Sequence, residues 1–460
     1  MTLTIILSIA TCLGLIAVVL LKPNMTIGSH TVDLSWVEAL LGAVLFIVLG
    51  CISPKEVLMG ITASGAVNPI KILVLFISMT MLSVYLDSIG FFSYLAGMVM
   101  YRTKGSRKSL FFILYILVSV LTVFTSNDII ILTFTPFICY FTKSARIDPL
   151  PYLIAEFVAA NTWSMALIIG NPTNIYLATG ASIGFVEYMV NMLLPTVCGA
   201  LTAMLLLFLI FRKELSRPMT PHPHAVEKPD RVGLIIGLVH LGGCTACLVV
   251  SSYVGLEMWI ITFFFALSLF ITTLISSLIR RKKPAELTEC LRRAPWQLIP
   301  FVLSMFVMVL ALNRYGVTEM VASALDHLSG TALVKDGHSG ESLLVSVRYG
   351  ISSVLAANFM NNIPMSVFYS DVLNKAQLGL SVYGAEPALK MSECATYATI
   401  AGSNIGAILT PVGALAGIMW SQMLKKNHVT FKFSNYVKCG MTIGIPSMLV
   451  TSLVIWLMVG

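Results

Sequence analysis

Charged residues are scarce in this sequence. Only 11% of its 460 residues are Asp, Glu, Lys or Arg, whereas 57% are hydrophobic. So little polar surface excludes an ordinary water-soluble globule. Long polar segments are also missing, because the two longest, 213–231 and 329–342, have only the length of loops. Apolar runs long enough to cross a bilayer recur along the chain. We therefore expect a polytopic membrane protein in contact with the lipid bilayer, without a separate soluble domain.

The signatures of common enzymes are missing as well. The sequence has no HExxH, no paired acidic motif and no GxSxG with catalytic partners. We therefore expect no enzyme and no cofactor, apart from Na⁺ or H⁺ as a coupling ion. The nine Cys are scattered through apolar segments and indicate no disulfide framework. Basic loops on the cytoplasmic side of a membrane explain the net charge of +8, so we expect no nucleic acid partner.

Two stretches of the chain resemble each other internally. Ser78 aligns with Ser304 and Gly90 with Gly316, at a constant shift of 226 positions. Such self-similarity indicates a structural repeat, which is common among secondary transporters.

Each copy then carries two matched interruptions. The first is an Asn-rich cluster inside an apolar stretch, at 125–136 and at 358–366. The second is an apolar segment broken at Pro, at 168–174 and at 408–414. Interrupted hydrophobic segments at corresponding places in two halves of a membrane protein indicate the substrate site of a secondary transporter.

The remaining apolar segments predict ten membrane spans. They lie at about 2–21, 34–53, 70–90, 150–180, 190–212, 231–252, 256–280, 296–314, 391–422 and 436–459. Two further apolar regions, 107–143 and 341–378, are interrupted by polar residues near their middles, so we expect each to form a re-entrant hairpin. Amphipathic arms at 91–103 and 316–329 would join a span to each hairpin.

The basic residues orient these spans. When the loops between these spans are sorted by side, most of the 29 Lys and Arg lie on one side of the membrane. The other side keeps seven of them: Lys55, Lys71, Arg314, Lys335, Arg348, Lys375 and Lys390. The basic side is cytoplasmic, so both termini lie outside, and a cytoplasmic membrane location is expected. Each half has an odd number of spans, so the second half is inverted. The predicted fold is an all-α polytopic protein of two inverted five-span repeats, 1–212 and 231–460, joined by a cytoplasmic linker at 213–230.

Irregular backbone inside a membrane is tolerated only where it is buried in protein or lines a cavity. We therefore expect the interruptions to form a substrate or ion site, from Ser126, Asn127, Asp128, Asn161, Gly170, Asn171, Thr173, Asn174, Asn358, Asn361, Asn362, Ser403, Asn404 and Thr410. A bound Na⁺ would take its ligands from Ser126, Asn127, Asn171, Asn361 and Asn404. The alternative is that these residues only cap helices and support Pro kinks.

Two acidic residues are candidates for proton coupling. Acids inside a membrane are expensive to bury and usually functional. Asp128 lies at the first hairpin tip, and Glu156 lies near the start of a span. Glu156 has an alternative interpretation as an interfacial acid near the cytoplasmic surface. No Lys or Arg falls in the central motifs, so a multiply charged anion would need bound cations or helix ends to balance its charge.

At these residues the chain resembles the ion-transporter superfamily. That superfamily includes the arsenical pump membrane protein (ArsB), NhaD-type Na⁺/H⁺ antiporters and citrate- or dicarboxylate–Na⁺ symporters. APWQLIPFVLSMFVMVLAL at 294–312, MNNIP at 360–364, ILTPVGALAGIMW at 408–420 and the SND tip at 126–128 resemble the arsenite-permease branch. GNPTN at 170–174 resembles a signature found across the wider superfamily, which includes carboxylate transporters.

The resemblance implies an inverted-repeat elevator transporter, usually a homodimer, in which a transport domain moves against a scaffold. It implies one half-site at Ser126–Asp128 and Asn171–Asn174 and another at Asn361, Asn362, Ser403, Asn404 and Thr410. The dicarboxylate branch has Ser-Asn-Thr at both tips, and this chain departs from it. Trivalent arsenic or antimony efflux is the substrate assignment that the resemblance favours, with any ATPase as a separate subunit.

Three other interpretations remain open at this stage. A Na⁺/H⁺ antiporter and a Na⁺-coupled di- or tricarboxylate transporter share the expected fold. A channel is the third, although its continuous polar path contrasts with polar residues that cluster near the middle of the membrane.

Overall fold

The computed structural model describes residues 1–460 apart from 22–23, 28–29, 63–67, 103–104, 220–227, 328–338 and 377–384. The regular secondary structure of the described part consists of helices and one two-stranded hairpin. Its helices are α1 (Thr2–Leu21), α2 (Leu34–Val48), α3 (Pro54–Thr62), α4 (Pro69–Ser88), α5 (Phe91–Arg102), α6 (Arg107–Phe124), α7 (Asn127–Ser144), α8 (Leu150–Trp163), η1 (Ile168–Gly170), α9 (Pro172–Gly180), α10 (Phe185–Leu215), α11 (Arg231–Val254), α12 (Met258–Ile279), α13 (Ala285–Arg293), α14 (Leu298–Arg314), α15 (Val317–His327), α16 (Ser339–Met360), α17 (Asn362–Lys375), α19 (Ala385–Leu409), α20 (Leu415–Lys426) and α21 (Phe433–Val459). The strands are β1 (Asn24–Ile27) and β2 (His30–Asp33).

The length and composition of these helices fit a protein that crosses a membrane. Eight described segments are long and apolar enough to do so: Pro69–Ser88, Arg107–Phe124, Phe185–Leu215, Arg231–Ser251, Met258–Ile279, Ala285–Arg314, Gly340–Met360 and Phe433–Val459. Predicted spans at the N-terminus correspond to shorter apolar helices, Thr2–Val18 and Leu34–Val48. Helices α6 and α16 reach spanning length, so length alone does not identify them as arms of re-entrant hairpins, and their re-entry stays a prediction.

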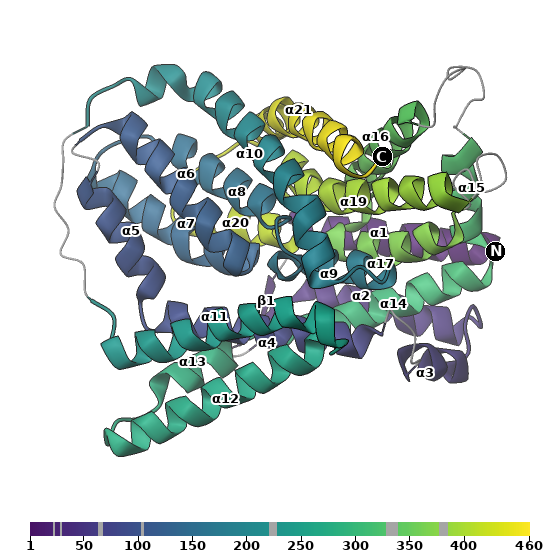
Figure 1. Ribbon diagram of the computed structural model, residues 1–460, viewed down its shortest axis with the longest axis horizontal. Coiled ribbons are helices and arrows are strands. Elements are labelled where there is room, and N and C mark those ends of the chain that lie inside the picture. Colours follow the sequence, from purple (N-terminus) through teal and green to yellow (C-terminus); the bar gives the residue numbers. More distant parts are fainter. Residues whose placement is uncertain are drawn as a thin grey trace.

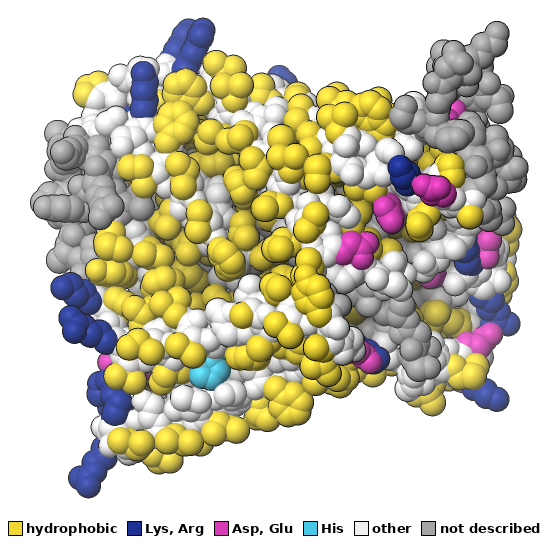
Figure 2. Space-filling model, in the orientation of Figure 1, with side chains coloured by type: hydrophobic (Ala, Val, Ile, Leu, Met, Phe, Trp, Pro, Cys, Tyr) yellow, Lys and Arg dark blue, Asp and Glu magenta, His cyan; other side chains and the backbone are white. Residues whose placement is uncertain are grey.

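A broad apolar surface lies between two charged ends (Figure 2). Lys and Arg gather at the left end of that view, whereas most of the visible Asp and Glu lie toward the right end, together with further Lys and Arg. Helix α12 shows why the surface is apolar, since Phe264, Leu278 and Ile279 are 59%, 69% and 77% exposed. Large side chains with that much exposure are stable in lipid and unfavourable in water.

The interruptions predicted from the sequence are present as helix breaks. Helices α6 and α7 are separated at 125–126, and α16 and α17 meet at Asn361. The predicted span at 150–180 is divided into α8 and α9, and α19 is separated from α20 by residues 410–414. The order of elements from α4 to α10 therefore repeats from α14 to α21, while inversion of the second repeat stays a prediction.

The predicted amphipathic arms correspond to α5 and α15. Each follows a glycine with a positive φ angle, 80° at Gly90 and 72° at Gly316. These glycines are aligned by the shift of 226 positions. Because only glycine adopts this backbone region without a steric penalty, the same turn directs the chain into both arms.

Helices α4, α11, α12 and α13 pack together along the lower side of the molecule in Figure 1. Helices α10 and α21 pack against each other along the opposite side. The divided helices lie between these layers, where α8 contacts α6, α7 and α10, and α19 contacts α16, α17 and α21. All residues from Pro151 to Thr162 and from Cys394 to Leu409 are buried, so the interrupted helices form the centre of the protein.

The structure adds elements that sequence analysis missed. The β1–β2 hairpin and the short helices α3 and α13 had no sequence prediction. Helix α10 continues to Leu215, beyond the predicted end of the first repeat at 212. Parts of the predicted linker, of the 329–342 loop and of the end of the second hairpin lie outside the described residues, at 220–227, 329–338 and 377–378, as do Lys22, Lys104 and Lys335.

Candidate functional site

Asn404 joins the two divided helices. Its Oδ1 accepts hydrogen bonds from Ser164 Oγ at 2.8 Å and from Asn171 Nδ2 at 2.9 Å. Its Nδ2 donates to Asn174 Oδ1 at 2.7 Å. All four side chains are fully or almost fully buried, where an unpaired polar group would be costly. The amide of Asn404 therefore connects residues more than 200 positions away in the sequence.

The GNPTN segment forms the break between α8 and α9. Asn171 caps α9 by accepting from the Thr173 amide at 3.2 Å, and Pro172 occupies the first turn, where a missing N–H has no cost. Asn174 Nδ2 donates to the carbonyls of Ser164 at 2.8 Å and Leu167 at 3.1 Å, so its side chain bonds to backbone groups at the break. At Gly170 an added Cβ would lie 2.2 Å from the Ser164 carbonyl oxygen, so only glycine fits there.

A second bond crosses between the halves. Thr173 Oγ1 and Ser403 Oγ are 3.0 Å apart, and both side chains are completely buried. Together with Asn404, this contact holds the start of α9 against α19.

The tip of the first hairpin rests on α8. Ser126 caps α7 through its Oγ, which accepts from the Asp128 amide at 3.3 Å. Asn127 Nδ2 donates to Asn161 Oδ1 at 3.2 Å, and Asn161 Nδ2 donates to the Phe157 carbonyl at 2.8 Å. Asp128 is partly exposed, and its carboxylate has no hydrogen-bond or ion-pair partner within the part of the chain that the structure describes.

The second hairpin tip rests on the break between α19 and α20. Asn361 has φ 73° and ψ 153°, a conformation that costs a residue other than glycine about 1–3 kcal/mol. The strain is offset locally, because its Nδ2 donates to the Val412 carbonyl at 3.2 Å and the Asn362 amide donates to the Gly413 carbonyl at 3.1 Å. Backbone strain that is held by surrounding contacts is typical of functional sites.

Asn358 and Thr410 complete this second tip. Thr410 Oγ1 donates to Asn358 Oδ1 at 2.7 Å, and Asn358 Nδ2 donates to the Gly406 carbonyl at 2.9 Å. Helix α16 is thereby tied to α19 close to Asn404.

The predicted site residues therefore form a connected network, but the two predicted half-sites are not separate. Asn404, assigned by resemblance to the second, hydrogen-bonds directly to Asn171 and Asn174 of the first. The hairpin tips are linked through Asn161 and Val412 of the divided helices, without a tip-to-tip hydrogen bond among the described residues. Whether these residues bind a substrate or Na⁺ stays a prediction.

The network has few fixed charges. No Lys or Arg occurs at 125–128, 161–174, 358–364 or 400–414, and Asp128 is the ionisable side chain of these segments. Helices α7, α9, α17 and α20 begin at or next to these segments, and the N-terminus of each helix carries a partial positive charge. This environment can hold a small anion, a neutral polyhydroxylated solute, or a cation bound by amide and carbonyl oxygens.

Sequence reasoning missed Ser164. It donates to Asn404 and lies seven residues before Asn171, just as Ser403 lies seven residues before Thr410. Extending the comparison of the two broken segments by a few residues toward the N-terminus would have found it.

Glu156 lies in a more enclosed place than an interfacial acid. Its side chain is completely buried, and Thr135 Oγ1 is 2.9 Å and 3.1 Å from its two carboxylate oxygens. No ion pair to Glu156 occurs among the described residues. An interfacial acid would keep its carboxylate in water, so this complete burial disagrees with that interpretation, while a role of Glu156 in proton coupling stays a prediction.

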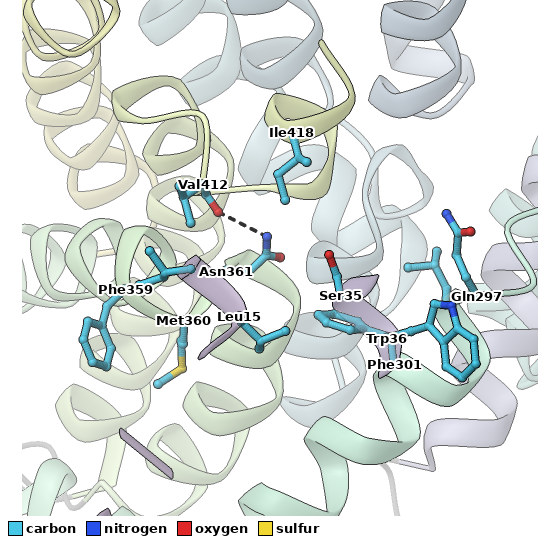
Figure 3. Close-up of a pocket in the computed structure, with 12 residues that line it drawn as sticks. Leu15, Ser35, Trp36, Gln297, Phe301, Phe359, Met360, Asn361, Val412 and Ile418 are labelled. Carbon is cyan, nitrogen blue, oxygen red and sulfur yellow. Dashed lines mark hydrogen bonds between the residues drawn. The ribbon is translucent and has the colours of Figure 1, made fainter. Parts of the chain in front are cut away.

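An apolar pocket adjoins the second hairpin tip (Figure 3). Asn361 points toward Val412 across one side of it, and Ser35 and Trp36 of α2 lie on the other side. The volume open to the centres of water molecules is about 30 Å³, enough for one or two waters. The pocket thus separates the tip from helices α1, α2 and α14, and its lining consists of Leu15, Ile16, Ser35, Trp36, Gln297, Leu298, Phe301, Phe359, Met360, Asn361, Val412 and Ile418.

Comparison with known proteins agrees with a transporter. The family model described as "Citrate transporter" (CitMHS) matches residues 16–392. The chain is 26% identical to the arsenical pump membrane protein of Escherichia coli strain K12 over 426 residues, 90% of this chain and 91% of that protein. It is 24% identical to the putative arsenical pump membrane protein of Bacillus subtilis strain 168 over 427 residues, 87% of this chain and 89% of that protein.

A solved structure shares the fold. The crystal structure of the Alcanivorax borkumensis YdaH transporter, described as having an unusual topology, superposes with a TM-score of 0.54 and covers 99% of this chain and 98% of its own. At 14% sequence identity this similarity concerns the fold alone.

Proposed function

Since the chain belongs to the citrate transporter (CitMHS) family of secondary transporters, we propose that it couples an ion gradient to the movement of a small anion or oxyanion-like solute across the cytoplasmic membrane. We propose arsenite or antimonite efflux as the specific activity. The similarity to arsenical pump membrane proteins over nine-tenths of the chain supports this assignment.

The observation that carries the proposal is the Asn404 network. It gathers amides and hydroxyls from both divided helices at the centre of the protein, beside helix N-termini, in segments that contain no Lys or Arg. Trivalent arsenic in water is a neutral trihydroxide, which such donors and acceptors can bind without a balancing cation. The departure of both hairpin tips from Ser-Asn-Thr supports this choice over a dicarboxylate.

We assign the coupling role at the tip to Asp128. Its partly exposed carboxylate, without a partner among the described residues, can take up a proton or coordinate Na⁺ beside Ser126 and Asn127. In the proposed cycle both hairpins and both divided helices move as one unit against the remaining helices, in a homodimer with its termini outside the cell. An ATPase, where one takes part, is a separate subunit.

Arsenite accumulation in an arsenite-sensitive bacterial host tests this function. Cells that produce the protein are expected to accumulate less arsenite than cells with an empty vector. Cells with Asp128→Asn are expected to lose this difference, because Asn cannot carry the proton or balance a cation. Unchanged accumulation with well-expressed wild-type protein would contradict the substrate assignment.

A second candidate is a Na⁺-coupled di- or tricarboxylate transporter, or a Na⁺/H⁺ antiporter of the same fold. The family description and the GNPTN segment favour it. Citrate uptake into proteoliposomes with and without a Na⁺ gradient distinguishes it from arsenite efflux. Single-channel currents in planar bilayers would support a channel instead.

A further inference from the structure

Helix α20, which follows the second break, reaches the side of α8 where Glu156 is buried. Helix α7 of the first hairpin packs against both α8 and α20. Thr135 on α7 is the hydrogen-bond donor to the Glu156 carboxylate. The indole of Trp420 on α20 also lies against this carboxylate, although its N–H makes no hydrogen bond in the described part of the chain. One acid is thus enclosed by helices of both halves of the protein.

An ionised carboxylate in this place would be poorly compensated. Among the described residues it has one hydroxyl donor and no cationic partner, and moving an unpaired charge into a protein interior costs several kcal/mol. The other titratable group facing it from α7 is the Cys139 thiol, which is buried too. From α21 the neighbouring titratable group is Tyr436, whose ring packs 5.7 Å from that of Trp420. None of these neighbours supplies a positive charge.

Aromatic rings separate Glu156 from a large pocket. The rings of Phe157 and Trp420 are 5.0 Å apart, and those of Trp420 and Phe431 are 6.4 Å apart. Beyond them lies a pocket with a volume of about 620 Å³, large enough for many water molecules. Lys425, His428 and Lys432 are part of its lining, and the two Lys belong to the predicted cytoplasmic side.

The same pocket also reaches the second break. Pro411, Ile418 and Trp420 are all part of its lining. A separate and much smaller cavity of about 10 Å³, the size of a single water, is also lined by Trp420, together with Ile154 and Phe157 of α8. Trp420 therefore lies against Glu156 on one side and lines both cavities on the other.

We propose that Glu156 is a proton-binding site of the transport cycle, loaded and emptied through the pocket between α20 and α21, with Trp420 as the side chain that separates it from water. This inference rests on the proposed function as an ion-coupled transporter. In the step itself, one proton passes from pocket water to a Glu156 oxygen and converts the carboxylate to a neutral acid. The reverse transfer returns the proton to water, and no other bond changes.

The position of Glu156 explains how its protonation would change the binding of solute. It lies five positions before Asn161, a rise of about 7.5 Å along α8. Asn161 holds the first hairpin tip through Asn127, and Thr135 lies on the helix that follows the same tip. A change of charge at Glu156 alters its bond to Thr135 and therefore the attachment of α7 to α8. Glu156 thus acts on solute binding through the hairpin.

Glu156→Gln tests this proposal, because Gln keeps an oxygen for Thr135 but cannot take up a proton. The measurements are net arsenite transport in proteoliposomes with and without a pH gradient, and arsenite exchange at equal pH on both sides. A pH gradient is expected to stimulate wild-type transport about tenfold and to leave Glu156→Gln unstimulated, while exchange continues. Glu38→Gln is the matched control, since Glu38 is a partly buried acid of α2, away from this site, and should behave as wild type.

Each other outcome has a definite meaning. A Glu156→Gln protein that is still stimulated by the pH gradient overturns the proposal, as does a folded variant that has lost exchange too. A wild type driven by Na⁺ alone overturns it but leaves the transporter assignment intact. A wild type that moves neither arsenite nor citrate under any gradient contradicts the proposed function itself.

Wild-type protein supplies a second test in case Glu156→Gln does not fold. Dicyclohexylcarbodiimide reacts with protonated carboxyl groups in apolar surroundings, and mass spectrometry locates the modified residue. Glu156 is expected to be modified in mildly acidic buffer and much less in alkaline buffer. Absence of modification at both pH values, or equal modification at both, would overturn the proposal.

Discussion

At the scale of single residues, Asn404 carries the largest share of the polar contacts at the centre. It accepts from two side chains and donates to a third, and none of these partners reaches water. Each buried polar group left without a partner costs about 1–3 kcal/mol. The amide thus stabilises the junction of the two halves and, in the proposed function, also forms part of the solute site.

Asn404→Ala is expected to lower the free energy of unfolding by about 3 kcal/mol or more, because Ser164, Asn171 and Asn174 each lose a partner. The measurement is thermal unfolding in detergent together with arsenite transport, which should also be lost. Asn427→Ala is the control, since Asn427 is exposed and bonds only to the Met423 carbonyl. Equal stability of the two variants would show that the network contributes little.

At the scale of helices, the second helix of each predicted hairpin, α7 or α17, is bonded to the helix that precedes the amphipathic arm, α4 or α14. Asp87 at the end of α4 accepts from Thr133 of α7 at 2.9 Å and pairs with Arg293 of α13 at 2.6 Å. Asn313, at the position of α14 that the 226-residue shift aligns with Asp87, donates to Asp371 of α17 at 3.0 Å. Both ties cross the boundary between the proposed moving helices and the proposed scaffold.

A disulfide across the first tie is expected to stop transport if α7 moves against α4. The variant combines Asp87→Cys and Thr133→Cys in a background without native Cys, and transport is measured before and after oxidation. Dithiothreitol should restore the activity, and the two single-Cys variants should be unaffected by oxidation. Full activity of the cross-linked protein would mean that α4 and α7 move together.

At the scale of the whole molecule, the distribution of charge defines two ends of an apolar body. The end of α20 carries Lys425 and Lys426 and the loop after it carries His428, whereas the start of α4 carries Lys71, paired with Glu257 at 2.6 Å. From the positive-inside rule we expect the end of α20 to face the cytoplasm and the start of α4 to face outside. The inverted repeat depends on this expected orientation.

Labelling of single cysteines tests this orientation. A membrane-impermeant maleimide is expected to label Asn427→Cys only in permeabilised cells, and to label Ser182→Cys, in the loop between α9 and α10, in intact cells. Both substitutions are made in the same background without native Cys. Labelling of both from one side of the membrane would contradict the inverted repeat.

Local features of the fold could be predicted from the sequence. The break at GNPTN follows from Pro172, which suits the first turn of a helix, and from Asn171, whose side chain caps it. The cap at Ser126 and the turn at Gly90 are local for the same reason, because residues within a few positions make the contacts that define them. The short helices α3 and α13 were missed because their apolar periods are brief and loops flank them.

What the sequence determined by itself is therefore an apolar body with interrupted helices and Asn-rich tips at known positions. Only the tertiary structure decided which of these residues meet. Asn404 finds Asn174 across 230 positions, and Glu156 finds Thr135 and Trp420 on helices from different halves. Hydropathy and capping patterns describe interactions within a few residues, whereas these partners are selected by how α8, α19 and α20 pack, which depends on the whole chain at once.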